Sequence, residues 1–282
     1  MTHVQDDQPL PDSDRERQIF VTLATVFCLL SALVGLGVLG SPIDEVAGGA
    51  LASDATLVAP ARWAFLLWRP IYLGMIAYTI VQWLPGEQTR QVHREIGWLA
   101  GWSMILAGAW VLVAQREWLW LGVLFLFATL VVLALINLAL ARHRDDRRTL
   151  VTWLATDVTF GVYLGWSCIA TIAMITATLR SVYITYGLLD PFLALAVLMI
   201  GAGVGIRLAL HTHASLSILF GFLWGYAGIA WARSFGELQS TLVAAGAVIA
   251  AVTLVAGTLA VRWAMSRPAQ AVPPAAGDLA AP

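Results

Sequence analysis

Several apolar runs of about 20 residues constrain the fold of this chain more than any other feature. An α-helix rises about 1.5 Å per residue, so about 20 residues cross a hydrocarbon core of about 30 Å. Inside that core each backbone polar group needs a partner within the protein, which leaves helices and closed barrels. The runs are continuous, and 60% of the chain is apolar while 12% is charged. We therefore predict an all-α, polytopic membrane helix bundle with about eight transmembrane helices.

The apolar runs predict eight spans, with polar segments before the first and after the last. The spans lie at about residues 18–40, 62–84, 97–115, 118–141, 150–179, 191–210, 214–233 and 240–264. We expect residues 1–17 and the proline- and alanine-rich tail at 267–282 to be disordered. A cleaved signal peptide is the alternative interpretation of the first apolar run. However, five acidic residues precede this run, and the run is too long for the apolar region of a signal peptide.

The distribution of arginine predicts how the chain is oriented. All 16 basic residues are arginine, and eleven of them fall on the side that carries both termini. The positive-inside rule then places both termini in the cytoplasm. Abundant alanine and arginine without lysine are typical of a GC-rich bacterial genome, so we expect a multi-pass protein of the bacterial cytoplasmic membrane. The net charge of −1 gives no reason to expect a nucleic-acid partner, and the lipid bilayer is the expected environment.

The second span is unusually aromatic and cationic where it begins, between residues 60 and 70. Its first half carries Arg62, Trp63, Phe65, Trp68, Arg69 and Tyr72. Arg62 and Arg69 are seven residues apart and share a helical face, next to the aromatic side chains. Such a surface can stack a flat apolar ligand and meet its carboxylate. The alternative is an interfacial aromatic belt with arginines that extend to lipid headgroups. Physical arguments alone leave both interpretations open.

Charged residues inside the spans are few. Asp157 and Arg207 lie at similar depth near the cytoplasmic side, so we predict that they form a structural ion pair. The alternatives are that Arg207 extends to the interface and that Asp157 caps a shorter fifth span. The chain has no HExxH, CxxC, Walker A or GxSxG motif, so we expect no catalytic residues, no metal site and no cofactor. Cys28 and Cys168 lie within spans, and we expect them to be packing residues.

Small residues predict close helix packing. Four GxxxG pairs occur, at Gly97/Gly101, Gly161/Gly165, Gly201/Gly205 and Gly221/Gly225. Packing within the bundle is the first interpretation, and a homodimer interface is the second. The glycine-rich, acidic segment 41–61 after the first span is long for a connection in a compact membrane protein. It is either slack or a lid.

Two spans carry motifs of a known family. The second span reads Trp68, Tyr72, Met75 and Trp83 after Pro60. The fifth span reads Phe-Gly-Val-Tyr-Leu-Gly-Trp over residues 160–166, followed by Ala170 and Thr171. With the weaker match of Trp110 in the third span, the chain resembles the TspO/MBR family. That family includes the translocator protein (the peripheral benzodiazepine receptor) and the bacterial tryptophan-rich sensory proteins.

The resemblance implies a five-helix TspO-like bundle over residues 18–180, with a three-helix C-terminal extension over 181–266. It also implies a pocket near the outer face, closed by segment 41–61, for porphyrins, sterols or synthetic benzodiazepine-type compounds. The implied pocket residues are Trp63, Phe65, Trp68, Tyr72, Trp110, Tyr163, Trp166 and Ala170, with Arg62 or Arg69 at an acidic edge of the ligand. The chain departs from the family at Ala109 and Met174, where asparagine is usual, and at Thr159, where proline is usual. The apolar wall is therefore better preserved than the polar features.

These arguments favour an integral membrane binding and sensory protein that takes up a flat apolar ligand, tetrapyrrole-like or sterol-like. A small-molecule transporter that uses the last three spans is the alternative. It predicts a continuous polar pathway, whereas the spans hold few polar groups and show no clear inverted repeat. An enzyme acting on a membrane-embedded substrate ranks lowest, because no paired carboxylates or metal-ligand spacing are present.

Overall fold

The computed structural model describes residues 12–144, 146, 148–182, 184 and 187–267, and this part of the chain is helical with connecting loops. Eight helical elements in it are long and apolar enough to cross a membrane. They are α1 (Asp12–Gly35), η1 with α3 (Arg62–Val81), α4 (Gln91–Gln115), α5 (Leu119–Arg142), α6 to α7 (Leu150–Ser181), η3 with α8 (Gly187–His211), α9 (Leu216–Phe235) and α10 (Thr241–Ser266). The predicted all-α polytopic bundle of eight spans is confirmed.

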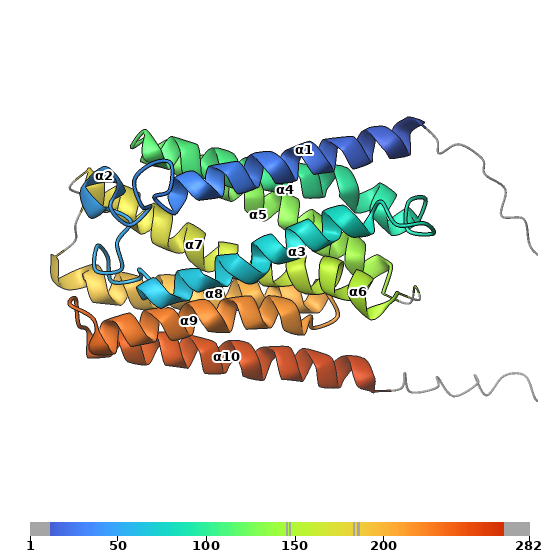
Figure 1. Cartoon of the computed structure of the whole chain (residues 1–282). Coiled ribbons are helices and arrows are strands. Elements are labelled where there is room, and N and C mark those ends of the chain that lie inside the picture. Colours follow the sequence, from blue (N-terminus) through green and yellow to red (C-terminus); the bar gives the residue numbers. More distant parts are fainter. Residues whose placement is uncertain (1–11, 145, 147, 183, 185–186, 268–282) are drawn as a thin grey trace, which may run out of the picture.

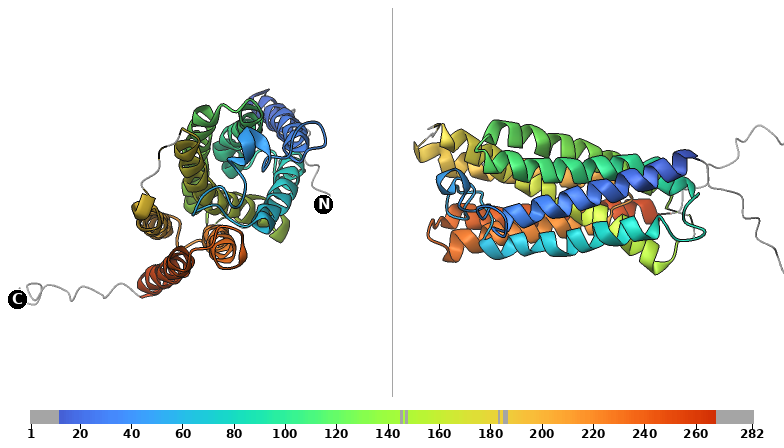
Figure 2. Two further views of the ribbon diagram at one scale, coloured as in Figure 1. Left: turned by 90° about the vertical axis from the view of Figure 1, so that its left-hand side faces the viewer. Right: turned by 45° about the horizontal axis from the view of Figure 1, so that its top comes forward.

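The first five spanning elements form a ring, and the last three pack against one side of it (Figure 1 and Figure 2). Around the ring α1 packs on α4, α4 on α5 and α5 on α7, and α3 contacts both α1 and α7. Helix α9 packs on α7, while α10 packs on α8 and α9. The element that contains α7 is 72% buried over its apolar segment, against 33–50% for the other spans. Helix α7 is therefore the centre of the fold.

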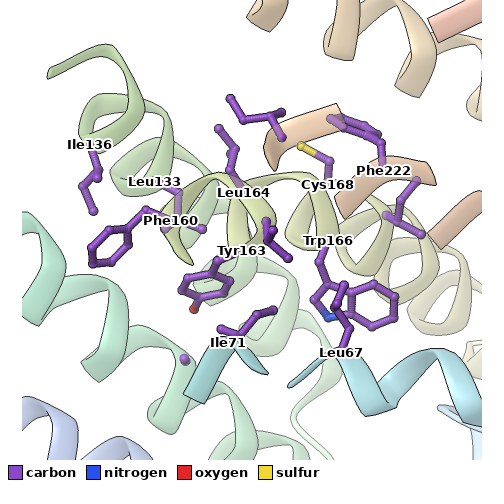
Figure 3. Packing of buried hydrophobic residues seen from close by; sticks show 14 of the residues in the cluster. Leu67, Ile71, Leu133, Ile136, Phe160, Tyr163, Leu164, Trp166, Cys168 and Phe222 are labelled. Atoms are coloured by element: carbon purple, nitrogen blue, oxygen red, sulfur yellow. The ribbon is translucent and has the colours of Figure 1, made fainter. Parts of the chain in front are cut away.

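The core surrounds the first turns of α7, where Phe160, Tyr163 and Trp166 are buried (Figure 3). Ile71 of α3 and Phe222 of α9 belong to the same cluster. Lipid tails are as apolar as these side chains, so a bundle in a bilayer is held mainly by close packing and by polar contacts between helices.

Glycines bring the backbones of α7 and α9 into contact. A methyl group added at Gly165 would lie 2.2 Å from the carbonyl oxygen of Ile218, and one at Gly221 would lie 2.4 Å from that of Val162. The remaining GxxxG pairs also pack within the chain: Gly97 and Gly101 against Arg17 and Phe20, and Gly201 and Gly205 against Tyr226 and Leu254. All four pairs therefore serve packing within the bundle. A homodimer stays a prediction, and these glycines give no support to it.

The expectation of disorder up to residue 17 is wrong for residues 12–17, because α1 begins at Asp12. Arg17 is buried and donates hydrogen bonds to the carbonyl oxygens of Gln88 (2.7 Å) and His93 (3.1 Å). Asp14 accepts a 3.0 Å hydrogen bond from Nε of Arg94. These bonds to α4 and the loop before it hold the first turn in place. Residues 1–11 and 268–282, for which disorder was predicted, lie outside the described residues.

The overlong fifth span is one continuous element with a π-helical segment near its start. Helix α6 (Leu150–Trp153) leads into the π-helical η2 (Leu154–Val158) and then α7 (Thr159–Ser181). The cap is Thr149, whose hydroxyl accepts a 3.1 Å bond from the amide of Thr152. Asp157 therefore lies inside the helix and caps nothing.

The predicted Asp157–Arg207 pair is wrong: Asp157 is bound by the guanidinium of Arg148. Arg207 is exposed on α8, and no ion pair joins it to another described residue. Arg148 lies in the connection before α6, and it also donates a 2.6 Å hydrogen bond to the carbonyl oxygen of His143. The connection thus folds back over the end of the bundle, so that Arg148, and not Arg207, is the cation next to Asp157.

Candidate functional site

A small cavity of about 50 Å³ lies at the end of the ring where η1 begins, away from the first turn of α1 and the last turn of α10 (Figure 1). Its walls come from segment 43–60, η1 (Arg62–Leu67), α3 (Trp68–Val81), α4, α5 and α7. Seen from this end, the segment that contains α2 (Val46–Gly49) lies across the ring (Figure 2). The segment therefore covers the cavity, as a lid would.

Five of the predicted pocket residues line this one cavity. They are Phe65, Trp68, Trp110, Trp166 and Ala170. The edge of the Phe65 ring meets Trp166, with centroids 5.6 Å apart and planes at 85°. Trp68 and Trp166, which we expected to form opposing walls, thus belong to the same cavity. Ligand binding by these residues stays a prediction.

Local structure explains how these side chains reach the cavity. Segment Arg62–Leu67 is a 3-10 helix, in which residues three apart align, so Phe65 and Trp68 lie on the same side. Pro70 follows in the first turn of α3, where proline is tolerated. On α7 the lining residues are Trp166, Ala170, Ala173, Met174 and Ala177, whose spacing places them on one helical face. Three alanines on that face leave the space that forms the cavity.

Three other predicted aromatic residues lie outside the cavity. Tyr72 stacks on Trp68 with centroids 5.3 Å apart, and the edge of Tyr163 meets Trp68 at 5.6 Å. These two rings support Trp68 from α3 and α7. Trp63 instead packs edge-on against Trp224 of α9, at 5.2 Å. Sequence reasoning grouped all of them because it could not separate the rings that line the cavity from those that support them.

The two arginines of the predicted pocket are not at the cavity. Arg62 is 82% exposed and forms a 2.7 Å ion pair with Asp44 of the covering segment. Arg69 is exposed on α3 and does not line the cavity. The structure therefore places no arginine where the acidic edge of an enclosed ligand would lie.

Polar contacts hold the covering segment in place. Gln115 of α4 donates to the carbonyl oxygen of Ser41 (2.7 Å) and accepts from its amide (3.2 Å). The amide of Ala61 donates to the carbonyl oxygen of Gly228 on α9 (3.0 Å). Buried Arg233, also on α9, donates to the carbonyl oxygen of Ser53. Helix α9 thus anchors the middle of the segment, at Ser53, and the residue that directly follows it, Ala61.

Three residues carry a buried polar atom that has no hydrogen-bond partner among the described residues: Thr56 (Oγ1), Trp110 (Nε1) and Trp166 (Nε1). All three residues line the cavity. Buried polar groups are normally paired, and leaving one unpaired costs about 1–3 kcal/mol. The rest of the lining is apolar and contains no acidic, basic or cysteine side chain. The lining is thus apolar apart from indole N–H groups and one hydroxyl.

Sequence reasoning missed the contribution of α9 and the unpaired hydroxyl of Thr56. Arg233 carried a usable signal, because an arginine within a membrane-spanning helix is expensive and usually functional. No sequence signal indicated Trp224 or Gly228. In the part of the chain that the structure describes, no group of three His, Cys, Asp or Glu residues is placed to hold a metal ion, and Cys28 and Cys168 are buried free thiols.

Comparison with known families agrees with this architecture. A sequence model of TSPO-like proteins matches residues 18–260, which is most of the chain. The chain belongs to the TSPO-like family. The match continues well past residue 180, where we expected the resemblance to end, and it includes α8, α9 and most of α10. These helices are therefore part of what the TSPO-like family shares with this chain. No curated protein and no solved structure matches the chain.

Membership in the TSPO-like family and eight apolar helices make this chain a multi-pass membrane protein of the TspO type. The covered aromatic cavity lies between segment 43–60 and the predicted motifs of α3 and α7. The cavity is thus the candidate functional site of this TSPO-like protein. Of the last three helices, α9 is the one that contacts the segment covering the site.

Proposed function

We propose that this protein binds a flat, apolar ligand with hydrogen-bond acceptors, tetrapyrrole-like or sterol-like, in the cavity beneath segment 43–60. The observation that carries the proposal is the set of three unpaired polar atoms in an otherwise apolar, aromatic cavity. The faces and edges of Trp68 and Trp166 would contact the ligand body. The indole N–H groups of Trp110 and Trp166 would donate to its acceptors. Family membership supports a binding role of this type.

The cavity has to enlarge before such a ligand can enter. Its volume is about 50 Å³, whereas small-molecule sites usually measure about 300–1,000 Å³. The covering segment combines buried apolar side chains, such as Val46 and Val58, with polar contacts, such as the bond from Arg233 to Ser53, and a local opening would break both. We therefore propose that segment 43–60 opens to admit the ligand. Arg62, which pairs with Asp44 and is largely exposed, lies outside the cavity, so a ligand carboxylate would meet it only at the surface of the covering segment.

We propose binding without catalysis. The lining has no acid, base or nucleophile of the kinds that general acid–base or covalent catalysis uses. Its polar side-chain groups are three indoles and one threonine hydroxyl, which position a ligand and do not transfer protons readily at neutral pH.

The test is a titration of purified protein with protoporphyrin IX, followed by porphyrin absorption and by tryptophan quenching. We expect Trp68→Ala to weaken binding by about 2 kcal/mol, or roughly 30-fold in Kd. The matched control is Trp120→Ala, which removes an exposed tryptophan of α5 away from the cavity. Equal affinity in Trp68→Ala and the wild-type protein would refute the proposed site. If porphyrin fails to bind, a sterol such as cholesterol is titrated in the same way.

A further inference from the structure

A second and much larger hollow lies between the ring and the last three helices. Its volume is about 580 Å³, within the range of about 300–1,000 Å³ typical of ligand sites. Helices α3, α5 and α7 form one side, and the α8–α9 turn, α9 and α10 form the other. It shares no lining residue with the aromatic cavity. We call it the lateral cleft.

One end of the lateral cleft is cationic. Arg144, just after α5, and Arg262, near the end of α10, both line it and are both exposed. Neither forms an ion pair with another described residue. The acidic residue in the lining, Asp157, is already bound by Arg148. The charges of the two arginines are therefore available to an anion.

The other end of the cleft is apolar and reaches toward the middle of the bundle. It is lined there by Ile71, Val162 and Phe220. Phe220 is 47% exposed and Leu216, one turn nearer the cationic end, is 53% exposed. Large apolar side chains exposed on a membrane-spanning helix face lipid tails. Phe220 and Leu216 both line the cleft, so their exposed surface gives it an apolar wall on α9.

The cationic end lies at the same end of the molecule as the first turn of α1 and the last turn of α10 (Figure 1). The positive-inside rule predicts that this end faces the cytoplasm. The cytoplasmic leaflet carries the anionic lipids, and basic pockets between membrane helices on that side suit their headgroups. A soluble anion would use the arginines but leave the apolar half of the cleft without a function.

We propose that the lateral cleft binds an anionic phospholipid of the cytoplasmic leaflet. Its phosphate lies between Arg144 and Arg262, and one acyl chain lies along Ile71, Val162 and Phe220. Two arginines from separate elements meet one phosphate, which joins the end of α5 to the end of α10. The lipid thus ties the five-helix ring to the last three helices where the protein itself makes few contacts between α5 and α10.

The test is native mass spectrometry of the purified full-length protein with added phosphatidylglycerol or phosphatidylcholine. We expect one tightly retained phosphatidylglycerol, and a loss of affinity of about tenfold or more in the double variant R144Q/R262Q. The single variant R262Q gives an intermediate loss. The matched control is R207Q, which removes another exposed arginine near the same end that does not line the cleft.

Three outcomes would overturn the proposal. Unchanged phosphatidylglycerol binding in R144Q/R262Q would remove the arginines from the site. Equal binding of phosphatidylcholine would show an apolar groove without charge selectivity. Displacement of the lipid by glycerol 3-phosphate at a similar concentration would show that the cleft recognises a soluble anion and that its apolar half contributes nothing.

Discussion

Trp224 of α9 donates a 2.8 Å hydrogen bond from its indole N–H to the carbonyl oxygen of Ala64, in the 3-10 helix that carries Phe65 toward the aromatic cavity. The Trp224 ring also meets Trp63 edge-on. A methyl group added at Gly228, one turn further along α9, would lie 2.7 Å from Cβ of Ala64. Helix α9 therefore fixes the backbone on which part of the cavity wall is built.

This relationship gives the last three helices a structural role. Helix α9 packs along the central helix α7 and reaches the covering segment, while α10 packs on α9 from outside and α8 packs mainly on α10. The family match continues to residue 260. It therefore agrees with all eight spans forming one structural unit, and not with a five-helix protein that carries an appendage. Changes in α9 should therefore alter the cavity without touching its lining.

The first prediction concerns the bond between Trp224 and Ala64. We expect Trp224→Phe, which keeps an aromatic ring but removes the donor, to lower the stability of the folded protein by about 1 kcal/mol. The control is Trp231→Phe on the same helix, because Trp231 is 53% exposed. Thermal unfolding in one detergent measures both variants. Equal melting temperatures for the two would show that the bond contributes nothing.

The second prediction concerns Arg233, whose guanidinium is buried and holds the carbonyl oxygen of Ser53 while Nε and Nη1 have no partner among the described residues. We expect Arg233→Met to speed hydrogen exchange in residues 50–59 by about tenfold or more, because a charge-assisted bond is lost. Global stability should change by less than about 1 kcal/mol, since removing a poorly satisfied buried charge offsets the lost bond.

Arg180→Met is the control for that experiment, because Arg180 is an exposed arginine at the end of α7. It should leave exchange in residues 50–59 unchanged. If Arg233→Met also leaves this exchange unchanged, Arg233 does not hold the covering segment and its burial needs another explanation.

The spans were predictable because the evidence for them is local: apolar length alone predicts a membrane-spanning helix. The cavity residues Phe65, Trp68 and Trp166 were predicted through the resemblance of the second and fifth spans to the TspO/MBR family. The division between Trp68, which lines the cavity, and Tyr163, which supports it, was not predictable. It depends on how α3 and α7 are rotated against each other, which packing decides.

The partner of Asp157 could not be found from depth in the membrane. The comparison with Arg207 considered residues within spans, whereas the actual partner, Arg148, lies in the preceding connection and folds back. Likewise, nothing in the sequence around Trp224 indicates a backbone carbonyl 160 residues away as its acceptor. Such contacts depend on the tertiary structure, and the neighbouring residues in the sequence do not indicate them.

The third prediction concerns the contact between α7 and α9. We expect Gly165→Val to destabilise the protein by about 3 kcal/mol or more, because the added atoms meet the backbone oxygen of Ile218, which cannot rotate away. The control is Gly203→Val on α8, where an added methyl group meets nothing within 4 Å. Size-exclusion profiles after heating compare the two. Equal heat resistance would mean that α7 and α9 are further apart than described.

The last prediction concerns pH and Glu87, in the loop between α3 and α4. Glu87 accepts hydrogen bonds from Arg90 and pairs with His93, both at 2.9 Å. Burial raises the pKa of Glu87, but the bonds from His93 and Arg90 outweigh it, so its pKa lies below the ordinary value. A carboxyl with a lowered folded-state pKa stabilises the protein above the ordinary glutamate pKa of about 4.3. That stabilisation is lost as the pH falls through the lower folded value.

We therefore expect the melting temperature of the wild-type protein to fall more steeply below pH 4.3 or so than that of Glu87→Gln. At neutral pH the free energies of unfolding of the two should differ by about 1–3 kcal/mol, because Glu87 is only 12% exposed and its partner His93 is buried. Glu117→Gln, which removes an exposed carboxylate at the other end of α4, is the control. If the melting temperatures of the wild-type protein and Glu87→Gln depended on pH in the same way, the pKa of Glu87 would be the same in the folded and unfolded states, which would contradict this prediction.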